Sequence, residues 1–155
     1  MRKILSVISV LSTLCLSRAA HAVPEGFKMV TFAKPPQITY PTGVAAGGNG
    51  EVYVSVDLNS SLDQKANRGK IVKCVDTDGD GVADRFTDFV PNIDSPRSSC
   101  FVGDTLYVVN PPFLSAFRDV DNDGVADEKV QLVTGMGFDL SFRGADHTSN
   151  GVRMG

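Results

Sequence analysis

The feature that most constrains the fold of this chain is an aspartate-rich segment that occurs twice. Asp76-Thr-Asp-Gly-Asp-Gly-Val-Ala-Asp84 returns, almost unchanged, as Asp119-Val-Asp-Asn-Asp-Gly-Val-Ala-Asp127. A segment that recurs in this way indicates two copies of one structural unit rather than a single irregular domain. The chain is therefore expected to be built from repeats.

The spacing of carboxylates within each segment is typical of a calcium loop. Aspartates fall at positions 1, 3, 5 and 9, and glycine at position 6 permits the sharp turn. The segments are not EF-hands, because the Glu of position 12 is replaced by Thr87 and Val130. The predicted ligands are the backbone carbonyls of Val82 and Val125 and the carboxylates of Asp76, Asp78, Asp80, Asp84, Asp119, Asp121, Asp123 and Asp127. The alternative is an Asx-rich turn without metal, but four carboxylates in one turn repel each other unless a cation lies between them.

Short alternating apolar segments flank the loops and predict antiparallel strands. The first copy contains a hairpin, a polar insertion at 57–69, a strand, the aspartate loop and a fourth strand, and the second copy repeats this order without the insertion. No long helix is expected. The expected strands are 43–47, 51–56, 70–75, 85–90, 97–102, 105–109, 113–117 and 128–133.

Four short strands per repeat are typical of a β-propeller blade, so the predicted class is all-β with a propeller fold. A β-sandwich is the alternative, but it predicts no internal copy. The expected organisation is a signal peptide at 1–22, a lead-in at 23–40 that is either irregular or an edge strand, and a partial propeller at 41–155. Within the propeller we expect a blade at 41–94, a blade at 95–134, a connector at 135–150 and the start of another blade at 151–155. Two blades cannot close a ring, so the chain is interpreted as an amino-terminal fragment of a longer protein.

The amino terminus predicts export. Arg2 and Lys3 precede an apolar stretch, and Ala20-His-Ala22 fits a signal-peptidase site, which indicates a periplasmic or secreted protein. The apolar stretch is too short for a comfortable membrane span. Cys74 and Cys100 remain after cleavage and are predicted to form a disulfide, the alternative being two small buried side chains.

Charge gives little support for a nucleic-acid partner. The chain has 15 basic and 18 acidic residues, and the acidic ones are concentrated in the two loops. No basic run or alternation of basic and aromatic residues is present.

His147 is the candidate catalytic residue, because His21 leaves with the signal peptide. A neutral imidazole suits proton abstraction, and Asp146 could orient it; the alternative is a loop histidine that hydrogen-bonds to backbone. In a four-stranded antiparallel blade, the link between the second and third strands leaves from the same end as the link to the next blade. His147 is therefore expected at the end that carries the insertion 57–69, opposite the aspartate loops.

The residues around His147 carry a family resemblance. Asp146-His-Thr-Ser-Asn-Gly-Val-Arg-Met-Gly155 resembles the Asp-His-x-Ser-Gly segment of the soluble glucose and sorbosone dehydrogenases that use pyrroloquinoline quinone (PQQ). A wider set of segments resembles the propellers of large exported dehydrogenase-like proteins of planctomycete and verrucomicrobial bacteria: Gly43-Val-Ala-Ala46, 98–109, Pro111-Pro-Phe-Leu114 and Gly144-Ala-Asp-His-Thr148. The resemblance implies six blades, a sugar or polyol substrate, PQQ as cofactor, His147 as base, and a cytochrome c domain or carrier as electron acceptor.

This sequence departs from the enzyme pattern in one place, because Asn150 is inserted between Ser149 and Gly151. The residues that hold the quinone in the family would lie after Gly155. The competing hypothesis is a non-catalytic, calcium-stabilised propeller that binds a polysaccharide or a partner protein.

Overall fold

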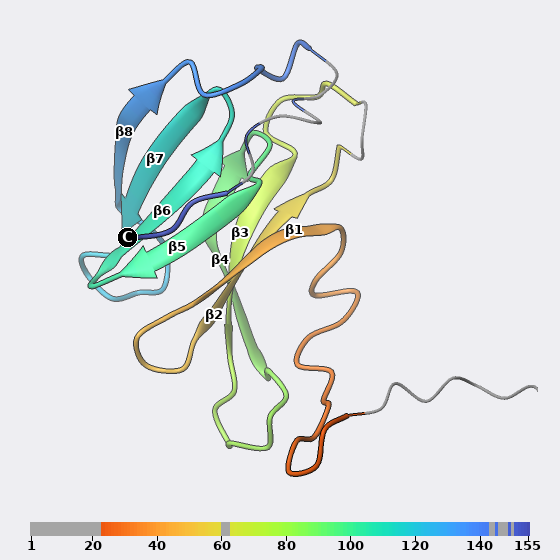
Figure 1. The fold of residues 1–155 in the computed structure, drawn as a ribbon. Coiled ribbons are helices and arrows are strands. Elements are labelled where there is room, and N and C mark those ends of the chain that lie inside the picture. Colours follow the sequence, from red (N-terminus) through yellow and green to blue (C-terminus); the bar gives the residue numbers. More distant parts are fainter. Residues whose placement is uncertain (1–22, 60–62, 143–144, 146–148, 150) are drawn as a thin grey trace, which may run out of the picture.

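A computed structural model describes residues 23–59, 63–142, 145, 149 and 151–155 of the chain. His147, the signal peptide and part of the insertion lie outside these residues. The described part is all-β, as predicted, and contains two separate four-stranded antiparallel sheets (Figure 1). The strands of the first sheet are β1 (Pro41–Ala46), β2 (Val52–Asp57), β3 (Gly69–Val75) and β4 (Arg85–Ile93). Those of the second are β5 (Ser98–Val102), β6 (Thr105–Asn110), β7 (Phe113–Arg118) and β8 (Glu128–Thr134).

Both sheets are meanders, in which each strand pairs with the next one along the chain. This is the strand order of a propeller blade, and the eight strands expected between 43 and 133 are confirmed, whereas the residues expected to start another blade, 151–155, form no strand. The sheets share even an irregularity. The β3–β4 register shifts between Ile71 and Val72, and the β7–β8 register shifts between Leu114 and Ser115, which occupy the same positions 43 residues later. The repeat seen in the sequence is therefore a repeat of detailed backbone structure.

The first sheet packs one face against the second sheet. The core between them contains Tyr53, Ile71 and Phe89 from the first sheet and Leu106 and Val108 from the second. Burial of these side chains removes apolar surface from water and is the main stabilising contribution to the contact between the sheets.

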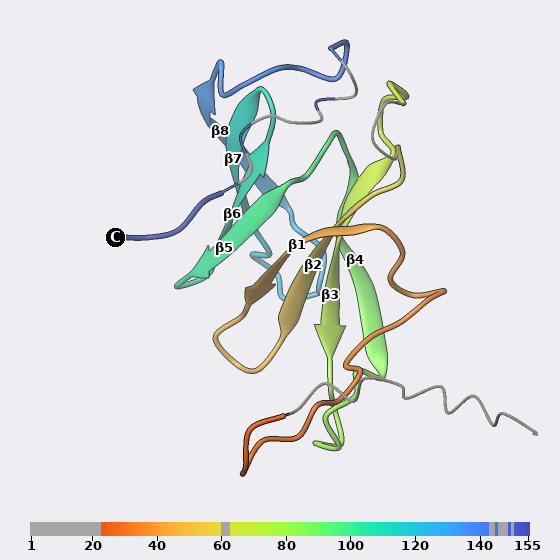
Figure 2. The same ribbon diagram turned by 45° about the vertical axis from the view of Figure 1, so that its right-hand side comes forward.

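The first strands of the two sheets lie beside each other, as Figures 1 and 2 show from two directions. Gly43 permits the close approach, because a Cβ there would lie 2.8 Å from the carbonyl oxygen of Arg97 and 3.1 Å from Cα of Ser98. The hydroxyl of Thr42 donates a hydrogen bond to the carbonyl of Pro96 next to this contact. Adjacent blades of a propeller meet in this way along their innermost strands.

The opposite face of the first sheet is partly covered by the lead-in. Val54, Val56, Val72 and Cys74 form a second cluster on this face, against which Phe32 and other residues of the segment 32–38 pack. The lead-in contains turns but no strand. Residues 151–155 also form no strand in this structure.

The predicted disulfide is wrong, because Cys74 and Cys100 are both free. Cys74 is fully buried in the cluster on the lead-in side of the first sheet. Cys100 lies in the second sheet, on β5 opposite Tyr107. The thiol of Cys74 thus faces away from the sheet that carries Cys100. Burial raises the pKa of the Cys74 thiol from 9.0 to about 11.

The predicted separation of the two ends of the sheets is confirmed for the described residues. The insertion and the connector after β8 lie together at one end, where the side-chain amide of Gln64 donates to the carbonyl of Ser141 at 2.9 Å. The two aspartate loops lie at the other end (Figure 1). No helix in the described part of the chain is long and apolar enough to cross a membrane.

Candidate functional site

The first aspartate loop is folded by its own carboxylates. Asp76 accepts hydrogen bonds from the backbone N–H groups of Gly79, at 2.7 Å, and of Gly81, at 2.8 Å. Asp80 accepts the N–H of Val82 at 2.7 Å. Gly79 and Gly81 have φ values of 78° and 91°, which side chains rarely adopt. The alternation of Asp and Gly in the sequence thus sets the path of the loop.

The second loop reproduces these contacts. Asp119 accepts the N–H of Gly124 at 2.9 Å, and Asp123 accepts the N–H of Val125 at 2.7 Å. Asn122 takes the place of the first glycine with a φ of 63°, a conformation that asparagine tolerates better than most residues. The two loops therefore have one backbone design.

Each loop brings three of its four carboxylates together. One oxygen of each lies within 4.8 Å of the others, in the groups Asp76, Asp78, Asp84 and Asp119, Asp121, Asp127. Asp80 and Asp123 do not join these groups, and each uses an oxygen to accept the N–H group two residues later. The carbonyls of Val82 and Val125 stay predictions as ligands.

The chemistry of the loops fits a hard cation with oxygen ligands. Hydrogen bonds from the backbone, first that of Gly81 and then that of Gly79, outweigh burial and lower the pKa of Asp76, so its carboxylate is ionised at neutral pH. In the second loop, Oδ1 of Asp119 is buried and has no hydrogen-bond partner among the described residues. A buried oxygen without a partner is costly, and a bound cation would satisfy it.

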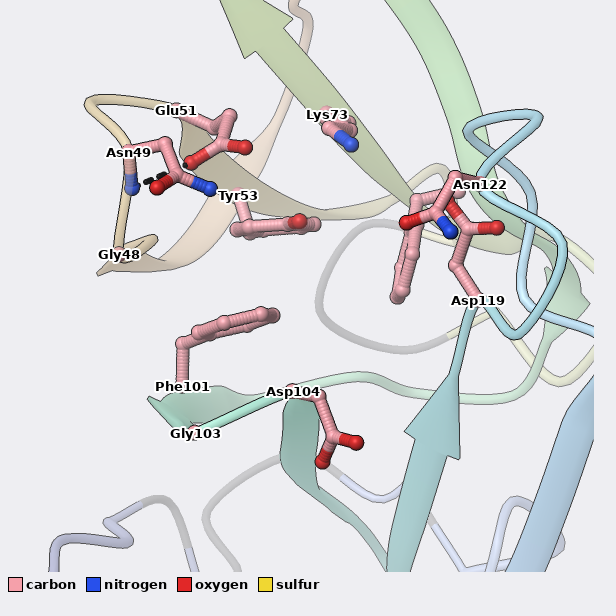
Figure 3. A pocket seen from close by; sticks show the side chains of 11 residues that line it. Gly48, Asn49, Glu51, Tyr53, Lys73, Phe101, Gly103, Asp104, Asp119 and Asn122 are labelled. Atoms are coloured by element: carbon pink, nitrogen blue, oxygen red, sulfur yellow. Dashed lines mark hydrogen bonds between the residues drawn. The ribbon is translucent and has the colours of Figure 1, made fainter.

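The second loop also borders a pocket between the two sheets (Figure 3). The position of the second loop is fixed by a hydrogen bond of 2.8 Å, which the N–H of Ala126 donates to the carbonyl of Phe89 on β4. The pocket has a volume of about 230 Å³. It is lined by Gly48, Asn49, Glu51, Tyr53, Lys73, Phe89, Phe101, Gly103, Asp104, Asp119 and Asn122.

Aromatic rings form one wall of this inter-sheet pocket. The ring of Tyr53 stacks on that of Phe101, with centroids 5.0 Å apart and planes at 11°. Phe89 meets Tyr53 edge to face, at 4.9 Å and 74°. Lys73 and Asp119 also line the pocket, and in Figure 3 they lie to the right of the rings of Tyr53 and Phe101. The pocket thus combines flat apolar surfaces with charged groups of both signs.

Two ionisable groups of the inter-sheet pocket, Tyr53 and Glu51, have shifted pKa values. Burial, followed by the charges of Glu51 and Asp119, raises the pKa of Tyr53 to about 12. Burial alone would raise the pKa of Glu51, but hydrogen bonds from its own backbone and from Asn49, together with the charge of Lys73, lower it. At neutral pH the phenol is therefore protonated and the carboxylate ionised. These groups suit binding, and neither has the near-neutral pKa of a general base.

Sequence reasoning missed the inter-sheet pocket. One signal was present in the sequence, since Glu51 and Tyr53 are two residues apart in an alternating segment; in the structure Glu51 directly precedes β2, and Lys73 on β3 is the register partner of Tyr53. The predicted base, His147, lies outside the described residues. At the end of the sheets that carries the insertion and the connector, the structure describes an ion pair in which Nη2 of Arg97 lies 3.3 Å from Oδ2 of Asp57. Asp57 also accepts the N–H of Asn59 at 2.9 Å, which anchors the start of the insertion.

Comparison with known proteins identifies a family for most of the chain. No curated protein and no solved structure matches the chain. One family, described as "Domain of unknown function (DUF7133)", matches residues 16–155. Because this match spans both sheets, both aspartate loops and the connector, the chain belongs to the DUF7133 family.

Proposed function

We propose that the chain is the amino-terminal part of a periplasmic or secreted, calcium-binding β-propeller that oxidises a sugar or polyol with PQQ. His147 takes the proton of the substrate hydroxyl, while the hydride of the same carbon passes to the quinone, so that an alcohol becomes a carbonyl compound. Electrons then leave to a cytochrome c domain or carrier. Bound PQQ would supply the hydride acceptor, and calcium would bind in the two aspartate loops.

One observation carries this proposal more than any other. The segment 146–155 resembles the histidine segment of PQQ-dependent dehydrogenases, and it follows a connector that lies at the end of the sheets opposite the aspartate loops. The loops of this end, together with the first strands of the sheets, surround the central axis of a propeller, where a ligand can be enclosed. Histidine suits the reaction, because the ordinary pKa of an imidazole, near 6.5, allows it to take a proton at neutral pH.

The inter-sheet pocket supports the alternative function. It offers an aromatic wall and charged groups of both signs, which suit binding of a sugar unit or a peptide side chain. In this alternative the protein is a calcium-stabilised propeller that binds a polysaccharide or a partner protein.

The decisive experiment uses the full-length protein reconstituted with calcium and PQQ. An artificial electron acceptor reports turnover over a panel of aldoses and polyols. Replacement of His147 by Asn keeps a hydrogen-bonding side chain but removes the basic nitrogen, so turnover should fall by about 10² to 10⁴. Ser149→Ala, close in sequence but without an acid–base group, is the control and should change turnover much less.

Binding measurements complete the test. PQQ should bind the His147→Asn variant nearly as well as the wild type, because the substitution removes the base and not the cofactor site. If the wild type reduces no acceptor with any substrate, or if His147→Asn retains full turnover, the catalytic proposal fails. Binding of an oligosaccharide without turnover would then favour the alternative.

A further inference from the structure

Each aspartate loop is hydrogen-bonded to the segment of the chain that precedes its own sheet. In the second loop, the N–H of Ala126 donates to the carbonyl of Phe89 on β4 at 2.8 Å. In the first loop, the N–H of Ala83, which has the same position in the motif, donates to the carbonyl of Phe32 at 2.8 Å. The backbone carbonyl of Phe32 thus binds the first loop in the same way as the carbonyl of Phe89 on β4 binds the second.

A second contact repeats with the same spacing. A Cβ built on Gly124 of the second loop would lie 3.5 Å from Thr87, two residues before Phe89. A Cβ built on Gly81 of the first loop would lie 3.6 Å from Val30, two residues before Phe32. The lead-in therefore follows the aspartate loop in the way that β4 does.

The sequence of the lead-in matches that of β4. Lys-Met-Val-Thr-Phe-Ala at 28–33 corresponds to Arg-Phe-Thr-Asp-Phe-Val at 85–90. In both segments the first residue is basic, the fifth is Phe and the sixth is a small or branched apolar residue. Both segments also lead into the next sheet in the same way. Tyr40 has a φ of 49° and precedes Pro41, and Ser95 has a φ of 44° and precedes Pro96.

The packing of side chains agrees with this correspondence. Leu106 and Val108 of β6 face the preceding sheet, and their counterparts on β2, Val52 and Val54, face the lead-in. The lead-in covers that face incompletely. A groove of about 550 Å³ remains between Phe32 and the first two strands, and Val44 at its edge is 67% exposed.

Residues 27–34 form no strand, although they lie where the outermost strand of a preceding sheet would lie. We infer that residues 28–33 are the outermost strand of a further blade, whose three inner strands are formed by the part of the full-length protein after residue 155. Those three strands pair with 28–33 and fill the apolar groove beside Val44. The blade so formed joins the two ends of the propeller.

A second copy of this chain is a poorer occupant. Both sheets of the copy already have four strands, so neither sheet lacks the outermost strand that residues 28–33 would supply. A three-stranded antiparallel sheet supplies both the backbone groups that pair with 28–33 and the apolar side chains that fill the groove. The inference rests on the proposed function only in that it needs the full-length propeller, and it needs neither PQQ nor turnover.

The test combines hydrogen exchange and proline substitution in the full-length protein, without PQQ. Amides of 28–33 should exchange at least about 100-fold more slowly than in the unfolded chain, because strand pairing protects them. Proline should be introduced singly at Met29, Val30 and Thr31. In a paired edge strand, every second N–H group donates to the neighbouring strand and the others face solvent. Proline should therefore lower the melting temperature more where it removes a paired N–H than where it removes a solvent-facing one, and the two kinds of position should differ by at least about 3 °C. The tolerated position is the built-in control.

Three results would overturn the inference. The first is exchange of the amides of 28–33 at the rate of an unfolded chain. The second is an equal effect of proline at all three positions, which a loosely packed segment would give. The third is protection that appears only at high protein concentration, because it would assign the pairing to a second molecule. Absence of dehydrogenase activity leaves all three measurements unchanged, so the two proposals fail independently.

Discussion

The contact between the two sheets depends on the aromatic rings at its centre, and Phe89 is the residue with which to test it. Its side chain is 1% exposed and meets Tyr53 edge to face at 4.9 Å. Replacement of a buried Phe by Ala costs about 3 to 5 kcal/mol. Because Phe89 also borders the inter-sheet pocket, water can enter the space left by the ring, so we expect a value near the lower limit, about 3 kcal/mol.

Phe86 provides a matched control on the same strand. It is partly buried and packs in the cluster on the opposite face of the first sheet. Phe86→Ala removes the same ring from a more exposed position, so its expected cost is about 1 to 2 kcal/mol. Urea denaturation of the full-length protein, followed by far-ultraviolet circular dichroism, gives both values, and comparison of the m-values identifies a change in cooperativity.

A double-mutant cycle then isolates the contact between the rings. Tyr53→Leu and Phe89→Leu keep apolar volume but remove the edge-to-face geometry, and the coupling energy should be about 0.5 to 1.5 kcal/mol. If Phe89→Ala costs no more than Phe86→Ala, the two sheets do not pack through this cluster and the pocket between them is not a fixed feature. Zero coupling would show that the edge-to-face contact of Tyr53 and Phe89, which joins two strands of the first sheet, adds nothing beyond the burial of each ring.

Two further predictions concern the loops and the thiols. Calcium at 100 times its dissociation constant should stabilise the full-length protein by about 2.7 kcal/mol per site, and Asp119→Asn should remove about half of the total effect of two equal sites, whereas Asp88→Asn, outside the loops, should leave it unchanged. Calorimetry and thermal melts measure both, and a melting temperature that ignores millimolar calcium contradicts the metal hypothesis. With a pKa raised from 9.0 to about 11, Cys74 should react with iodoacetamide at pH 8 about 100-fold more slowly than an unperturbed thiol, and mass spectrometry should find it labelled rapidly only in urea. Equal rates in the native and unfolded protein, or a Cys74–Cys100 disulfide, would show that the structure misplaces this side chain.

The strands and their order could be predicted from the sequence because the information is local. Alternation of apolar residues defines each strand, and Asp and Gly define the turns between them. Because the unit occurs twice, each strand and turn of one copy can be checked against its counterpart in the other copy. For this reason the expected limits of the strands agree closely with those in the structure, and the aspartate loops and the insertion lie at opposite ends of the sheets as predicted.

The cysteine pair and the inter-sheet pocket could not be predicted, because both depend on which face of the first sheet meets the second. Alternation shows that Cys74 and Tyr53 lie on opposite faces of their sheet, but it does not say which face packs against the next blade. The structure assigns Tyr53 to that contact and Cys74 to the lead-in side. The sequence leaves open whether the lead-in is irregular or an edge strand, because the prolines at 35 and 36 interrupt its apolar pattern.

The second aspartate loop joins the candidate metal site to the inter-sheet pocket. Asp119 belongs to the carboxylate group and also borders the pocket, and Ala126 of the same loop holds Phe89 in the pocket wall. A cation bound in the loop would reduce the negative charge that Asp119 presents to the pocket and would restrain the loop that closes it. Coupling between two binding sites is reciprocal. If calcium raises the affinity of the pocket for a ligand by some factor, the ligand must raise the affinity of the loop for calcium by the same factor. Under the calcium proposal, the second loop would therefore couple metal binding to ligand binding between the sheets, at the end opposite the insertion and the connector.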